Sequence, residues 1–282
     1  MPLRDEIKIR DPFILPLKEE GKYYLYGTTD KHPWSGSPGV GFNTYTSEDL
    51  ADWDGPFEVF TPPEGFWGKY NFWAPEVHLH KGRYYMFASF KADGVSRGTQ
   101  ILVADSPLGP FVPHSDGPVT PKEWWCLDGT LFVDDAGDPW MVFCYEWTQV
   151  NDGQMCAVKL TPELDAEVGE PGLLFTASEA RWSVPLPDKD HDCFVTDGPY
   201  LYRAKNGELL MLWSTHGKDG YAMGVARSSS GKLFGPWAQE PEPLYPKDGG
   251  HGMFFRTFDG QLMVTLHYPN DEPNERPFFL PV

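Results

Sequence analysis

Three aspartates and one histidine stand nine or ten residues before a glycine in four separate segments of the chain. They are Asp11, Asp128, Asp197 and His251, and the matching place in a fifth segment carries Trp73. Carboxylates gathered in one cleft raise one another's pKa, so one can be protonated while another is ionised. Hydrolysis of a glycosidic bond requires that combination, an acid for the leaving oxygen and a base for water. A third carboxylate could orient one of these two groups or tune its pKa.

The glycines that follow these residues open five similar segments. Each glycine is followed by an apolar and aromatic run, and the starts are Gly21, Gly82, Gly137, Gly207 and Gly260. The intervals of 61, 55, 70 and 53 residues fit one four-stranded blade with loops of variable length. An apolar strand and a polar turn precede each glycine, as in a β-hairpin. We therefore predict an all-β, five-bladed β-propeller, with residues 1–282 as one domain; a β-sandwich is the alternative.

The first strand of each propeller blade lines the central channel. The residues that begin those strands should therefore converge on one axis. We expect Asp11, Asp128, Asp197 and His251 to face one central cavity. Residues 6–9 and 277–282 both resemble strands, and we expect one of them to complete the fifth blade.

The charge of the chain limits the classes of molecule that it is expected to bind. The chain has 23 basic and 41 acidic residues, a net charge of −18, which repels phosphate backbones and anionic membrane surfaces. We therefore expect a carbohydrate partner and neither nucleic acid nor membrane. No apolar run approaches the roughly 20 residues that span a bilayer, and the first residues lack a signal-peptide core. The four cysteines have no metal-ligand spacing and should be buried and reduced, which favours the cytoplasm; a removed signal peptide would instead imply secretion.

The sequence resembles glycoside hydrolase family 43 over nearly its whole length. The matching segments are RDPFI at residue 10, NFWAPEVHLHKGRYYMFAS, LDGTLFVDDAGDPWMVF, TDGPYLYRAKNGELLMLWS and, near the end, GGHGMFF. Members of this family are five-bladed propellers with an inverting mechanism that act mostly on arabinofuranosides and xylosides. The resemblance implies a glycosidase that removes terminal α-L-arabinofuranosyl or β-D-xylosyl units from oligosaccharides or polysaccharides.

The resemblance also implies roles for three residues. Asp11 is similar to the family's general base, and Asp128 to the aspartate that tunes and orients the acid. His251 is similar to a histidine that lies beside a calcium ion or water in the propeller axis. Such a calcium ion would be held largely by water, which suits a hard cation.

One motif departs from the family pattern at the general acid. The family usually has Glu-Gly-Pro, whereas this chain has Asp197-Gly198-Pro199. Aspartate is one methylene shorter, so its carboxyl reaches roughly 1 to 1.5 Å less far, and proton transfer depends on hydrogen-bond reach. Asp197 could serve from a shifted strand, Glu146 or Glu76 could replace it, or the protein could be a weakly active or non-catalytic carbohydrate-binding propeller.

Other side chains are candidates for binding the sugar. Glu146 has aromatic neighbours, which raise a carboxyl pKa by desolvation. Trp73 and Trp147 could stack on a sugar ring, while Glu76 and Arg276 could hydrogen-bond its hydroxyls. The alternatives are structural strand-end carboxylates and a surface arginine. A phosphorylase or transferase would need a basic phosphate site, and the motifs described above contain no arginine or lysine cluster.

Overall fold

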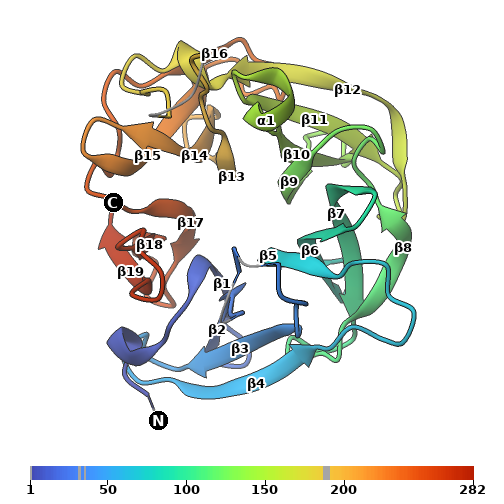
Figure 1. The fold of residues 1–282 in the computed structure, drawn as a ribbon. Helices are drawn as coiled ribbons and strands as arrows, with labels where there is room; N and C mark the ends of the chain where they lie inside the picture. Colours follow the sequence, from blue (N-terminus) through green and yellow to red (C-terminus); the bar gives the residue numbers. More distant parts are fainter. Residues whose placement is uncertain (1, 31–32, 35, 187–190) are drawn as a thin grey trace.

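The five-bladed β-propeller predicted from the repeats is confirmed. The structure is a computed structural model that describes residues 2–30, 33–34, 36–186 and 191–282. Nineteen strands of this part form five antiparallel sheets around a central axis, and the innermost strands are β1, β5, β9, β13 and β17 (Figure 1). The helical segments found in these ranges have three or four residues, and none is long and apolar enough to cross a membrane.

The first three blades have four strands each. Blade 1 consists of β1 (Arg10–Leu17), β2 (Lys22–Thr28), β3 (Phe42–Ser47) and β4 (Asp54–Phe60). Blade 2 consists of β5 (Tyr70–His80), β6 (Arg83–Ala92), β7 (Val95–Ala104) and β8 (Val112–Pro118). Blade 3 consists of β9 (Cys126–Val133), β10 (Pro139–Tyr145), β11 (Gln154–Leu160) and β12 (Glu167–Thr176), with the short helix α1 (Trp147–Val150) between β10 and β11.

The last two blades differ in strand number. Blade 4 consists of β13 (Asp197–Arg203), β14 (Leu209–Gly217), β15 (Gly220–Ser228) and β16 (Trp237–Gln239). Blade 5 has three strands rather than the predicted four, β17 (Gly250–Arg256), β18 (Leu262–Tyr268) and β19 (Arg276–Pro281). The C-terminal segment therefore completes this blade, as one of the two options predicted. The other segment, residues 6–9, is not a strand; it begins with the last residue of a 3₁₀ turn (Arg4–Glu6), and the Ile9 N–H donates to the Glu275 carbonyl.

The repeat glycines occupy the turns between the first two strands of each blade. All five have φ between +65° and +93°, a region that side-chain-bearing residues rarely adopt, so glycine is required for these tight turns. The apolar runs after them are buried between neighbouring blades, with Tyr26 and Trp213 fully covered. The four cysteines are buried and unpaired. The hairpin repeat thus fixes a rigid ring whose inner strands carry the site.

Candidate active site

Each innermost strand contains a bulge at the channel. The strand register shifts there in all five blades, and one residue of each bulge has a left-handed φ of 46–56°: Asp11, Ala74, Asp128, Gly198 and His251. Such a backbone is uncommon for any residue other than glycine. Strain repeated around one axis is typical of a functional site.

The bulges correct the alignment that we predicted from the sequence. Ala74 and Gly198 occupy the places that we expected for Trp73 and Asp197, so these two side chains start one residue earlier. Counting back from the turn glycines failed because the strands differ in length. Asp197 consequently enters the channel from the pre-bulge position and not from the position of Asp11 and Asp128.

Four bulges are fastened by a side chain from the preceding blade. The acceptors lie opposite the pre-bulge residue on the second strand of their own blade. The N–H of Asp11 donates to His267 Nδ1 (3.2 Å), that of Ala74 to Thr28 Oγ1 (2.8 Å), that of Asp128 to Ser89 Oγ (2.9 Å), and that of His251 to Ser214 Oγ (2.8 Å). Because buried N–H groups require partners, these bonds hold the strained backbone in place.

The fifth bulge is fastened differently. Cys144 stands at the equivalent place on β10, opposite Leu127, and a thiol is only a weak hydrogen-bonding group. The N–H of Gly198 donates instead to Asp128 Oδ2, at 3.0 Å. A carboxyl oxygen therefore replaces the hydroxyl or imidazole acceptor used in the other four blades, and it ties Asp128 to the residue that follows Asp197.

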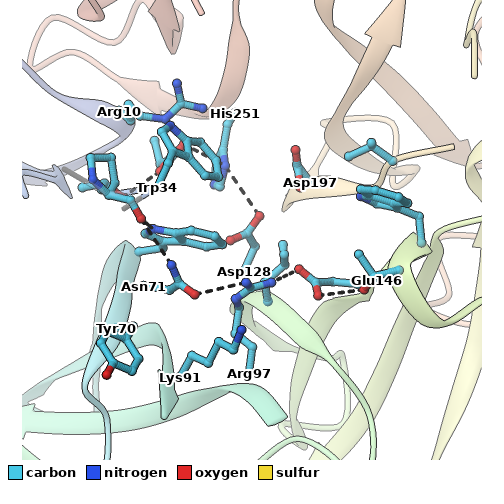
Figure 2. Close-up of a pocket in the computed structure, with 18 of the residues that line it drawn as sticks. Arg10, Trp34, Tyr70, Asn71, Lys91, Arg97, Asp128, Glu146, Asp197 and His251 are labelled. Carbon is cyan, nitrogen blue, oxygen red and sulfur yellow. Dashed lines mark hydrogen bonds and ion pairs between the residues drawn. The ribbon is translucent and has the colours of Figure 1, made fainter. Parts of the chain in front are cut away.

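His251 links two of the carboxylates at the centre of the ring. Its Nδ1 lies 3.1 Å from Asp11 Oδ1 and 3.6 Å from Asp128 Oδ2, and Figure 2 shows the contact with Asp128. Burial alone would lower the pKa of His251, but the two carboxylates outweigh burial and raise it to about 10. The imidazole is thus an imidazolium near neutral pH.

The Asp11 carboxylate is strongly stabilised in its ionised form. Burial would raise its pKa, but the charge and hydrogen bond of His251, followed by the charge of Arg10, hold the pKa well below its usual range. Thr28 Oγ1 also donates to Asp11 Oδ2, at 2.7 Å. An ionised carboxylate at this point is suited to accept a proton.

Asp128 and Asp197 have the opposite tendency. Burial raises the pKa of both, and it outweighs the lowering effect of the His251 charge. Asp197 Oδ2 accepts a hydrogen bond of 2.9 Å from the hydroxyl of Tyr221. The site therefore combines an ionised carboxylate with carboxyls inclined to stay protonated, which is the separation that acid and base catalysis needs.

These groups line one cavity of about 740 Å³. Asp11, Asp128, Asp197 and His251 all contribute to its wall, as we expected. The cavity is also lined by Glu146 and Trp147 from the α1 region and by Trp34, whose side chain is 56% exposed. A volume of this size is typical of a small-molecule site and accommodates sugar units.

Glu146, the alternative acid, is held by its neighbours. Arg97 pairs with its carboxylate and also donates to Asn71 Oδ1 (Figure 2), while Thr148 Oγ1 donates to Glu146 Oε2 at 3.2 Å. Burial raises the pKa of Glu146 although Arg97 opposes this shift. Glu146 is therefore at the cavity wall, but its carboxylate already has a cationic partner.

Trp73 lies in the cavity wall with much of its ring already in contact with protein. The Arg97 guanidinium lies 4.3 Å from its ring centroid, the Trp34 ring is 4.8 Å away, and the Trp73 N–H donates to the Pro33 carbonyl at 2.9 Å. Trp34 itself packs against Arg10 at 4.9 Å. The exposed Trp34 ring is consequently the freer surface for stacking on a sugar, and we did not predict it.

Two predicted binding residues do not line this cavity. Glu76 is 6% exposed and faces His78 Nε2 at 3.2 Å. Arg276 donates to the backbone carbonyls of Asp5, Pro273 and Glu275 beside the chain ends. Each side chain is engaged with partners outside the cavity, so the geometry gives no support to sugar contact by Glu76 or Arg276, and both stay predictions from the sequence.

The cationic residues of the cavity were not predicted from the sequence. Arg10, Lys91 and Arg97 contribute to the wall, although we predicted no arginine or lysine cluster. Arg10 and Arg97 are paired with Glu275 and Glu146. Arg10 could have been found, because it shares the pre-bulge position with Trp73 and Asp197; no sequence signal that we used pointed to Lys91, Arg97 or Tyr221.

The side chains around His251 do not form a metal site of their own. Within the described ranges, no group of three or more His, Cys, Asp and Glu side chains is arranged to hold an ion. The Nδ1 atom of His251 is engaged with two carboxylates. The donor set therefore does not fit a protein-ligated calcium ion.

Comparisons with known proteins agree with this geometry. The family model for glycosyl hydrolases family 43 matches residues 6–279. The structure of an endo-arabinase from Bacteroides thetaiotaomicron has 42% sequence identity and a TM-score of 0.92, and the match covers 99% of this chain and 96% of that one. An exo-α-(1→5)-L-arabinofuranosidase from Cellvibrio japonicus is 24% identical over 93% of this chain and 79% of its own length.

A xylosidase/arabinosidase from Humicola insolens is 30% identical, and the match covers 69% of each chain. The family match thus extends over almost the entire propeller, including all five strained bulges. The chain belongs to glycosyl hydrolases family 43 and is a glycosidase.

Proposed function

We propose that the protein hydrolyses α-L-arabinofuranosidic linkages of arabinan or arabino-oligosaccharides with inversion of the anomeric configuration. The observation that carries the proposal is the central cluster, in which ionised Asp11 faces the same cavity as the buried carboxyls of Asp128 and Asp197. The arabinan-degrading names of the Bacteroides and Cellvibrio relatives support the choice of sugar.

Each carboxyl has a separate part in the proposed reaction. Asp11 accepts a proton from a water molecule as the water oxygen bonds to the anomeric carbon. Asp197 donates its proton to the glycosidic oxygen as the bond between that oxygen and the anomeric carbon breaks. Asp128 acts on the acid by position, because its Oδ2 accepts the N–H of Gly198, the residue that follows Asp197. The net reaction adds one water molecule across the linkage.

The mode of cleavage has two candidates. Removal of terminal units is the mode that the sequence resemblance implies, and the Cellvibrio relative is named an exo-enzyme. The Bacteroides protein, with 42% identity, is named an endo-arabinase, which supports cleavage within the chain. A β-xylosidase activity is the second sugar candidate, because the Humicola relative is named for both sugars.

A substrate panel tests the proposal. The protein should release product from linear α-(1→5)-arabinan and from nitrophenyl α-L-arabinofuranoside faster than from nitrophenyl β-D-xyloside. Product sizes should be followed by chromatography from the earliest times, because arabinose alone indicates terminal attack and a ladder of oligomers indicates internal attack. Binding of arabinan without any hydrolysis would contradict the proposal and indicate a carbohydrate-binding propeller.

Calcium held through water near His251 remains a prediction from the family resemblance. If such an ion supports activity, EDTA should lower kcat and added Ca²⁺ should restore it, whereas Mg²⁺, which requires shorter and more regular coordination, should restore less. The measurement is arabinan hydrolysis after dialysis against chelator. Unchanged activity in a preparation shown to be free of calcium would contradict this prediction. The imidazolium of His251 would then be the cation at the centre of the ring.

A further inference from the structure

Tyr221 approaches the proposed acid more closely than its place in the sequence suggests. Its hydroxyl donates to Asp197 Oδ2 at 2.9 Å. Among the described residues, this is the hydrogen bond that the Asp197 carboxyl receives from another side chain. Burial raises the pKa of Tyr221 well above its usual range. The phenol therefore keeps its proton and acts as a donor.

The ring of Tyr221 is fixed on three sides. It stacks on His267, with ring centroids 5.6 Å apart and ring planes inclined by 16°. It also makes an edge-to-face contact with His216, whose ring centroid is 5.8 Å away. A Cβ atom at Gly250 would lie only 2.7 Å from Tyr221 Cε1. The absence of a side chain at Gly250 therefore provides the space for the Tyr221 ring.

His267 connects this ring to the proposed base. Its Nδ1 accepts the N–H of Asp11, so its other nitrogen, Nε2, carries the proton and donates to Asn270 Oδ1 at 3.1 Å. Burial, followed by the charge of Arg10, lowers the pKa of His267 to about 3. His267 is thus a neutral spacer between the Asp11 backbone and the Tyr221 ring.

We propose that Tyr221, seated on His267, is a positioning residue that orients the short Asp197 carboxyl for proton transfer. This inference rests on the proposed role of Asp197 as the general acid. When the Tyr221 hydroxyl binds Oδ2, that oxygen is the carbonyl oxygen of the protonated acid, and the proton is carried by Oδ1. Because Oδ2 is held by the Tyr221 hydroxyl, the protonated Oδ1 is directed to the leaving group. The stack of Tyr221 on His267 also sets the separation between acid and base on which inversion depends.

The variant Tyr221→Phe tests the inference, because phenylalanine keeps the stack and removes only the hydroxyl. We expect kcat on arabino-oligosaccharides, which have poor leaving groups, to fall about tenfold or more, and kcat on nitrophenyl arabinofuranoside to fall less than about threefold. KM should change little on either substrate. Tyr202→Phe is the matched control, since its hydroxyl accepts a surface hydrogen bond from Arg256, and its kinetics should be unchanged.

A double-mutant cycle with Asp197→Asn distinguishes action through Asp197 from an independent role. If Tyr221 acts through Asp197, adding Tyr221→Phe to Asp197→Asn should cost little further activity, because coupled residues are not additive. Additive losses, equal losses on both substrates, or no loss would overturn the inference. If Asp197→Asn alone fails to discriminate between the two leaving groups, the proposed acid itself is wrong, and this outcome is separate from a failure at Tyr221.

Discussion

Replacement of Asp11 by asparagine should reduce kcat by a factor on the order of 10² to 10⁴, the usual contribution of a general base. The physical reason is that the amide cannot take the proton of the attacking water. Asparagine is among the residues that best tolerate a left-handed backbone, and Asp11 has a φ of 53°, so the bulge should be retained. KM for arabino-oligosaccharides should remain similar, because the cavity wall is otherwise unchanged.

Two measurements make this prediction specific to the base. Proton NMR of the wild-type reaction should show the inverted anomer at the earliest times, and net retention would contradict the inverting assignment. Asp105→Asn is a suitable control, because this aspartate is exposed and forms a surface ion pair with Arg83. Loss of activity in both variants would indicate a general effect of charge and not loss of a base.

Asp197→Asn should reduce hydrolysis of arabino-oligosaccharides by about 10² or more, while nitrophenyl arabinofuranoside should lose much less. An activated aryl group departs without much proton assistance, whereas a sugar alcohol requires it. The raised pKa of Asp197 also predicts the pH dependence. The acid is active when protonated, so the rate should fall as pH rises through the titration of the Asp128 and Asp197 pair, and this alkaline limb should change in Asp197→Asn.

Glu146→Gln is the matched comparison for the acid. Glu146 lines the same cavity but is paired with Arg97, so we expect its amide variant to affect both substrates equally, through a disturbed wall. If Glu146→Gln shows the loss confined to poor leaving groups and Asp197→Asn does not, the acid is Glu146. Equal losses on both substrates for Asp197→Asn would point to a binding or structural role.

The charge arrangement explains why these carboxylates can coexist in a buried ring. Like charges at this spacing would raise one another's pKa, and His251 supplies the opposing charge between Asp11 and Asp128. Asp11 gains most, because Arg10 also favours its ionised form. Asp128 and Asp197 remain inclined to protonation, so one local arrangement provides both a base and an acid.

The propeller and the convergence of four polar residues on its axis could be predicted from the periodicity of the chain. The turn glycines recur because a tight hairpin needs a positive φ, and the strands beside them recur because each blade buries its faces against two neighbours. Both constraints are local, so they leave a periodic record in the chain. Asp11, Asp128, Asp197 and His251 could be predicted to meet, because the first strands of all blades share one axis.

The position from which each of those side chains enters the channel, and the partners that it has there, could not be predicted in this way. A bulge changes the register by one residue. Asp197 therefore occupies a different position in its bulge from Asp11 and Asp128, although all three precede their turn glycines by nearly the same number of residues. The pairing of Arg97 with Glu146, and the stack of Tyr221 on His267, join residues from different blades. Contacts between blades depend on the rotation and separation of whole sheets, and these quantities have no periodic signature in the sequence.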